Sequence, residues 1–168
     1  MRGHRVILLI GLATLAAPAA AQMPSSRPHE VLLHADALPA LHELWRLTLA
    51  AREERAACLG GRIEQDTAWV ERLKPLTTAA GDSLAVSAEG SLEDCSPPEW
   101  FGTVHTHVPL HDTDPVYSKF SGSDQGVMLA WVKRWRTSGV FCILFSESDA
   151  RCQVEGIEGV SMVPKMRY

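Results

Sequence analysis

Apolar and polar positions recur along the chain with two different periods, which predict both helices and strands. Over residues 37–53 the apolar side chains stand three and four positions apart, the spacing of a helix with one buried face. Asp36 is the predicted N-cap of this helix, and Pro39 lies in its first turn, where proline is tolerated. Residues 139–145 are instead almost continuously apolar, as expected of a central buried strand.

The rest of the chain divides into strand-like, helical and turn-like segments. Gly60 and Gly61 interrupt one strand-like run and predict a bend or a close backbone approach there. The other predicted strands cover residues 56–62, 68–73, 84–88 (a short one), 100–107 and 151–157. A second helix is predicted over 124–136, with apolar positions Val127, Leu129, Ala130, Val132 and Trp135. Loops are predicted over 74–83, 93–98 and 108–123, and a turn over 146–150. This order predicts an α/β or α+β domain with a single mixed β-sheet flanked by helices.

The first 21 residues have the pattern of a secretory signal peptide. A basic start containing Arg2 and Arg5 precedes an apolar run over residues 6–15, and Ala19-Ala20-Ala21 offers a cleavage site. The run is short for a bilayer span, so an uncleaved anchor is the less favoured alternative. The remaining chain then consists of a flexible lead-in over 22–30 and one domain over 31–168. We therefore expect an exported protein, periplasmic or secreted.

Net charge narrows the class of partner. With residues 1–21 removed, the chain carries a net charge of −6 with histidines neutral, and it has no basic stripe. Such a domain is a poor candidate for binding nucleic acid or an anionic membrane. The sequence does not indicate an oligomeric state.

Four cysteines remain after the signal peptide, an even number that favours disulfides in an exported protein. Cys142 and Cys152 flank a predicted hairpin, so we expect them to pair, which leaves Cys58 and Cys95 as the second bridge. The alternative is that some of the four are buried free thiols. No CxxC spacing is present, which argues against a zinc site built from cysteines.

The chemistry of the chain is concentrated in His105-Thr106-His107 and Ser121-Gly122-Ser123-Asp124. Residues i and i+2 of a strand point to one face, so His105 and His107 can converge on one metal ion. Asp124, near the start of the next predicted helix, can supply a third ligand. Three protein ligands and a water molecule form the usual catalytic zinc site rather than a closed structural one. The sequence therefore predicts a zinc centre.

Each motif also has a purely structural interpretation. Two histidines on one strand face are common surface or core residues. Ser121 and Asp124 have the spacing of a capping box at a helix N-terminus. Trp100 and Phe101 can line a substrate site, but they are expected in the core because they open a central strand.

The full set of residues resembles the JAMM (JAB/MPN) zinc metalloprotease family. That family places a Glu shortly before a small, apolar strand that ends in Gly, then H-[ST]-H at the end of a later strand, then S-x-x-D at the start of a helix. The residues that fit these positions in order are Glu54, His105, Thr106, His107, Ser121 and Asp124. The resemblance covers about residues 31–158 and implies a JAB/MPN-like, cytidine-deaminase-like domain.

The resemblance also implies a role for each residue. His105, His107 and Asp124 would bind Zn2+ as the cofactor. Glu54 would act as general base on a zinc-activated water and later deliver the proton to the leaving amine. Ser121 would donate a hydrogen bond to the carbonyl oxygen as charge develops on it. The reaction would be hydrolysis of a peptide or isopeptide bond without a covalent intermediate.

The chain departs from the family in one loop. The family usually has about seven residues between the second His and the Ser, whereas thirteen, residues 108–120, stand here. His111, Asp112 and Asp114 lie in this loop and can line the cleft, bind a second ion or, as we favour, simply be solvated.

Two residues are rivals for motif positions. Ser118 competes with Ser121 but lacks an Asp three residues later. Glu53 competes with Glu54, which we prefer for its distance to Gly61.

Export argues against ubiquitin as the substrate and favours a peptide, a protein tail or a cell-wall peptide. The sequence leaves two other functions open. The chain can be a non-catalytic MPN-type scaffold or an exported metal-binding module, although neither needs Glu54 and Ser121. It can also be a small disulfide-stabilised interaction domain in which the two histidines are incidental.

Overall fold

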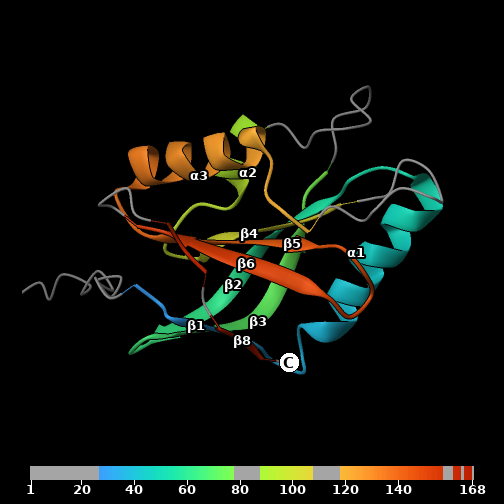
Figure 1. The fold of residues 1–168 in the computed structure, drawn as a ribbon, viewed down its shortest axis with the longest axis horizontal. Helices are drawn as coiled ribbons and strands as arrows, with labels where there is room; N and C mark the ends of the chain where they lie inside the picture. Colours follow the sequence, from blue (N-terminus) through green and yellow to red (C-terminus); the bar gives the residue numbers. More distant parts are fainter. Residues whose placement is uncertain (1–26, 78–87, 108–117, 157–160, 164, 168) are drawn as a thin grey trace, which may run out of the picture.

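A mixed eight-stranded sheet forms the centre of the fold (Figure 1). The structure is a computed structural model, and it describes residues 27–77, 88–107, 118–156, 161–163 and 165–167. The elements are β1 (Glu30–Leu33), α1 (Leu38–Ala51), β2 (Ala56–Glu64), β3 (Thr67–Pro75), α2 (Ala88–Asp94), β4 (Trp100–Thr106), α3 (Gly122–Trp135), β5 (Gly139–Leu144), β6 (Ala150–Glu155), β7 (Ser161–Met162) and β8 (Lys165–Arg167). The strand order is β7-β6-β5-β4-β2-β3-β1-β8. The predicted class, an α+β domain with one mixed sheet, is confirmed.

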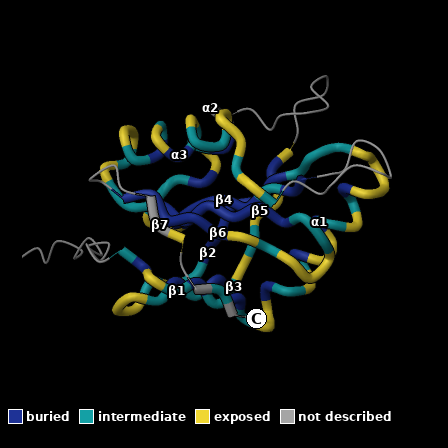
Figure 2. Tube along the Cα trace, viewed as in Figure 1, coloured by how far each residue is buried: buried dark blue, intermediate teal, exposed yellow. Residues whose placement is uncertain are grey.

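Both faces of the sheet carry helices. On one face α1 packs through Leu41 and Leu44 against side chains that include Leu59 and Val104. On the other face α3 packs through Met128 and Trp131 in a second cluster, which also contains Ala56, Cys58, Cys95, Trp100 and Phe141. Neighbouring residues of β2 alternate between the two clusters, as the period of a strand requires. Figure 1 shows α2 and α3 together on the second face, and Figure 2 shows the buried strands between the helices.

Most of the predicted long elements are confirmed to within a few residues. All six residues of β5 are buried, as the apolar run predicts. Trp100 and Phe101 lie in the core, with 7% and 4% of their surfaces exposed. Gly61 has φ +149, and the pairing register shifts on both sides of Gly60, so the predicted bend is a bulge. A Cβ at Gly61 would lie 2.0 Å from the Trp69 carbonyl oxygen, which explains the requirement for glycine.

Several local predictions are wrong. The N-cap of α1 is Ala37 without a side-chain bond, while Asp36 contacts His34 instead. The helix ends at Ala51 because Arg52 adopts a left-handed conformation. On α3 the buried residues are Met128 and Trp131, whereas Leu129, predicted on the apolar face, is 58% exposed.

The short elements were missed because their stability comes from tertiary contacts. Ala88 opens α2 rather than ending a strand, and this helix also includes Glu93, which was predicted in a loop. Tertiary contacts hold the helix: Arg134 of α3 pairs with Glu93, and Cys95 is bonded to Cys58. Strands β1, β7 and β8 have two to four residues each, too few to show a period. The predicted loop over 74–83 begins too early, because β3 continues to Pro75. Residues 1–26, 78–87, 108–117 and 157–160 lie outside the described residues, as do the predictions that fall on them.

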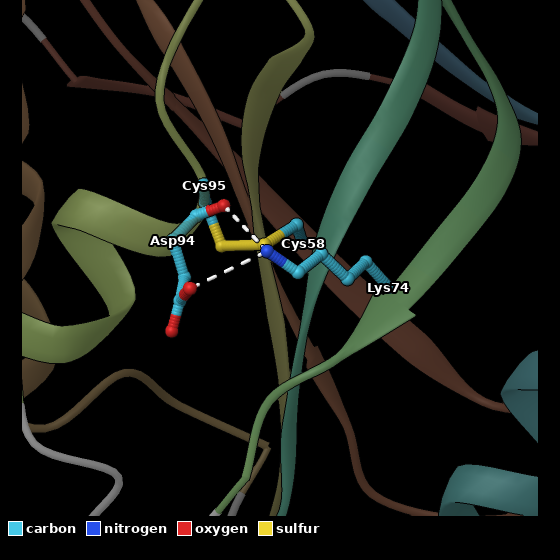
Figure 3. The surroundings of a disulfide bond; sticks show 4 residues. All are labelled: Cys58, Lys74, Asp94 and Cys95. Carbon is cyan, nitrogen blue, oxygen red and sulfur yellow. Dashed lines mark hydrogen bonds and ion pairs between the residues drawn. A yellow bond between two sulfur atoms is a disulfide. The ribbon is translucent and has the colours of Figure 1, made fainter.

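Both predicted disulfides are present. Cys142–Cys152 joins residues directly opposite each other on β5 and β6. Cys58–Cys95 joins β2 to the residue after α2, and Lys74 bonds to the backbone and side chain of Asp94 beside it (Figure 3). The two bridges fit an oxidising extracellular environment. Within the described ranges, no helix has the length and apolar character that a membrane crossing requires.

The two disulfides should contribute unequally to stability. In the chain-entropy account, the 37-residue separation of Cys58 and Cys95 is worth about 4 kcal/mol and the 10-residue separation of Cys142 and Cys152 about 3 kcal/mol. We therefore expect the double variant Cys58→Ala/Cys95→Ala to lose about 1 kcal/mol more than Cys142→Ala/Cys152→Ala in urea denaturation. A larger loss from the second pair would contradict this ranking.

Candidate metal centre

His105 and His107 lie at the end of β4, on the sheet face that α3 covers. His105 is the residue of β4 that stands opposite Ala56 of β2. Residues opposite each other in an antiparallel pair share a face, and Ala56 belongs to the cluster beneath α3. His107 follows the last residue of β4, and its backbone N–H donates to the carbonyl of Leu144 at 2.9 Å. This bond to the end of β5 continues the strand pairing as far as His107, so the His105 and His107 imidazoles, two residues apart, lie on the same face of the sheet.

Asp124 reaches the two imidazoles from the first turn of α3. Ser121 is the N-cap of α3 and forms a capping box with Asp124: the Ser121 N–H donates to Asp124 Oδ2 at 2.6 Å, and the Asp124 N–H donates to Ser121 Oγ at 3.2 Å. The structural interpretation of the S-x-x-D motif is thus correct. It does not exclude the metal interpretation, because the same carboxylate also faces both histidines.

A second contact fixes the start of α3 to the sheet. Gln125 of α3 and Gln153 of β6 exchange two amide hydrogen bonds, at 3.3 and 3.2 Å. Sequence reasoning missed this pair because its partners stand 28 residues apart with no pattern linking them. The pair holds the first turn of α3, and with it Asp124, over the end of β4.

The three side chains converge at the spacing of metal ligands. His105 Nε2 lies 3.0 Å from His107 Nε2 and 3.2 Å from Asp124 Oδ1, and His107 Nε2 lies 3.7 Å from Asp124 Oδ2. A tetrahedral zinc ion with bonds of about 2.0–2.1 Å separates neighbouring ligand atoms by about 3.3–3.4 Å. The three side chains are largely buried: 18% of His105, 9% of His107 and 16% of Asp124 is exposed. The group can therefore hold a metal ion.

The charges around Asp124 favour its ionised form. Burial is the largest single influence and raises the pKa of Asp124, but the hydrogen bonds from His105 and His107 and from the Ser121 backbone together lower it well below its ordinary range. A carboxylate that stays ionised between two imidazoles is suited to a divalent cation.

Glu54 lies beside this group. It is half-buried in the segment between α1 and β2, two residues before Ala56; it does not directly follow the helix, because α1 ends at Ala51 and not at residue 53 as predicted. Burial raises the pKa of Glu54, the charges of His105 and His107 oppose the rise, and the charge of Asp124 adds to it. Glu54 therefore lies close enough to the three converging side chains for its pKa to respond to their charges.

The rival residues are placed less favourably or lack described contacts with the site. Glu53 is directed towards Arg55, at 3.9 Å. Phe120, which sequence reasoning did not single out, lies next to His105 with a ring-to-ring distance of 6.4 Å and forms an apolar border of the site. Its position directly before the Ser121 motif is the sequence feature that could have identified it as a residue of the site. His111, Asp112 and Asp114 lie outside the described residues.

The chain was compared with protein-family models, curated proteins and solved structures, and only the solved structures give matches. No protein-family model matches the chain, and no curated protein matches it. The solution structure of protein DSY2949 from Desulfitobacterium hafniense is similar with a TM-score of 0.54 and 17% identity, over 82% of this chain and 91% of that one. The crystal structure of AF2198, a JAB1/MPN domain protein from Archaeoglobus fulgidus, has a TM-score of 0.43 and 17% identity, over 83% of this chain and 99% of that one. At such identity the likeness to DSY2949 shows a shared fold and no more.

The geometry predicts which substitutions abolish metal binding. In Asp124→Asn the amide oxygen can still accept from Ser121, so the cap survives while the anionic ligand is lost. Because loss of an outer-sphere partner alone costs about 10–100-fold in affinity, we expect zinc affinity to fall by more than about 100-fold in Asp124→Asn and in His107→Ala. Zinc stoichiometry after dialysis measures this, with His34→Ala, a partly exposed histidine that pairs with Asp36, as control. A full equivalent of zinc in His107→Ala would refute the ligand assignment.

Proposed function

We propose that the protein is an exported, zinc-dependent metallopeptidase of the JAMM (JAB/MPN) type. The observation that carries the proposal is the convergence of His105, His107 and Asp124 to 3.0–3.7 Å with a half-buried glutamate beside them. A structural metal site needs a fourth protein ligand and no base, whereas a hydrolytic site needs three ligands, an open position and a base. The order of the motif along the chain supports the same family.

The three ligands would hold zinc, which supplies Lewis-acid chemistry when bound: it lowers the pKa of water and polarises a carbonyl group. Glu54 accepts the proton of the attacking water and passes it to the leaving amine. Its burial suits this role, since a carboxylate with a raised pKa is a stronger base that still gives up its proton near neutral pH. No residue of the site needs to form a covalent bond to the substrate.

Ser121 is suited to stabilise the carbonyl oxygen of the substrate. Its Oγ accepts from the Asp124 N–H and lies 2.7 Å from Ser123 Oγ, where either hydroxyl can donate. When Ser123 donates, the Ser121 hydrogen is available for a substrate oxygen on which negative charge develops. The N-cap position thereby fixes Ser121 next to the ligand Asp124.

Residues 1–21 would act as the signal peptide, and the two disulfides would form after export. The substrate class that follows is a peptide or protein in the periplasm or outside the cell. Phe120 would form an apolar border next to the scissile bond.

Glu54→Gln separates catalysis from metal binding. The amide has nearly the shape of the carboxylate but cannot accept the proton, so we expect hydrolysis to fall about 10²–10⁴-fold while zinc stoichiometry stays unchanged. Glu53→Gln, one residue earlier, is the matched control and should retain activity. The assay is mass-spectrometric detection of cleavage in a peptide library, with and without a chelator.

The same assay distinguishes the alternatives. A wild-type protein that binds zinc and cuts nothing would be a scaffold or a metal-binding module. One that binds no zinc would be an interaction domain. Equal losses in Glu53→Gln and Glu54→Gln would refute the assignment of the base.

A further inference from the structure

Thr106, the residue between the two histidines, has a completely buried side chain that points away from the metal site. None of its surface is exposed, and the same holds for Thr48 of α1, whose hydroxyl lies 2.8 Å from the Thr106 hydroxyl. Because residues of a strand alternate, Thr106 must face α1 while His105 and His107 face α3. Its contacts therefore connect the histidine strand to the opposite layer of the fold.

The hydroxyl of Thr106 also holds the segment that carries Glu54. The backbone N–H of Arg55 donates to Thr106 Oγ1 at 2.9 Å, and Thr106 Oγ1 donates to the Arg55 carbonyl at 3.3 Å. The backbone N–H of Thr106 donates to the same carbonyl at 2.9 Å. A hydroxyl has one hydrogen and two lone pairs, so donation to Arg55 leaves it able to accept from both Arg55 and Thr48. The hydrogen and both lone pairs of the Thr106 hydroxyl then each have a partner.

This contact changes the strand ladder at Arg55, the residue directly after Glu54. Arg55 stands opposite Thr106 in the register that pairs Ala56 with His105. In a regular antiparallel ladder such a pair exchanges two backbone bonds. Here the Arg55 N–H donates to the side chain of Thr106 instead of taking the second of these bonds, and β2 begins only at Ala56. The Thr106 hydroxyl thus sets the path of the chain one residue after Glu54.

We propose that Thr106 is a positioning residue: its hydroxyl fixes the backbone at Arg55 and thereby holds Glu54 at its working distance from His105 and His107. The proposal rests on the function proposed above for Glu54 and adds how that side chain is placed. A base displaced by about 1 Å can cost about 100-fold in rate without loss of the ligands. The effect should therefore appear in kcat.

The test compares three substitutions in the full-length protein. Thr106→Val keeps the shape and removes the hydroxyl, Thr106→Ser keeps the hydroxyl, and Thr103→Val makes the same change at another buried threonine of β4. Crystal structures of the zinc-loaded variants should show Glu54 displaced from the histidines in Thr106→Val alone. Hydrolysis by Thr106→Val should show kcat reduced about 10–100-fold, with KM within about twofold and full zinc content. Thr106→Ser and Thr103→Val should match the wild type.

These measurements also distinguish a failure of the positioning role of Thr106 from a failure of the proposed peptidase function on which it rests. Failure of the wild type to hydrolyse any peptide would refute the proposed function, while the crystal structures would still decide whether Thr106 places Glu54. An unmoved Glu54 in Thr106→Val, or wild-type kcat, overturns the positioning role. Zinc loss in Thr106→Val also overturns it, since the residue would then support the ligands rather than the base. Thr106→Ser as impaired as Thr106→Val would show that the methyl group, not the hydroxyl, matters.

Discussion

The antiparallel pairing of β2 with β4 is the constraint on which the candidate site depends. Ala56 stands opposite His105, so Glu54, two residues earlier, falls on the side of the two histidines. A shift of this register by one residue would turn Glu54 towards α1 and away from the two histidines, because side chains alternate between faces. The bulge at Gly60 and Gly61 and the burial of neighbouring residues in two separate cores make such a shift costly.

The second support of the site is α3, which brings Asp124 to the end of β4. Trp131 and Met128 hold the middle of the helix in the core, and Gln125 fixes its first turn to β6. Asp124 completes the capping box with one oxygen while facing His105 with the other. The carboxylate therefore has an orientation that does not depend on a metal ion, and the interactions that start the helix also orient this candidate ligand.

Local patterns were sufficient to predict the long elements and the motif, because both are written in consecutive residues. The buried run of β5, the bend at Gly60 and the H-x-H spacing each follow from a period or a residue type. The failures share a different cause. Helix α2 is held by Cys95 and Glu93 through partners far away in the chain, and Leu129 is exposed because the docking of α3, not its composition, decides which face is buried. The contact of Gln125 with Gln153 and that of Thr106 with Arg55 likewise exist only once the sheet has formed.

These arrangements favour a site that is formed before any metal ion binds. Each of the three candidate ligands has a contact that does not involve the others: His107 with the carbonyl of Leu144, His105 with β2 through the strand ladder, and Asp124 with Ser121. In small domains that fold only with zinc, the free energy of metal binding is the free energy of folding. Here two packed clusters and two disulfides already stabilise the fold, so little of the binding energy of a metal ion would be needed to order the three side chains.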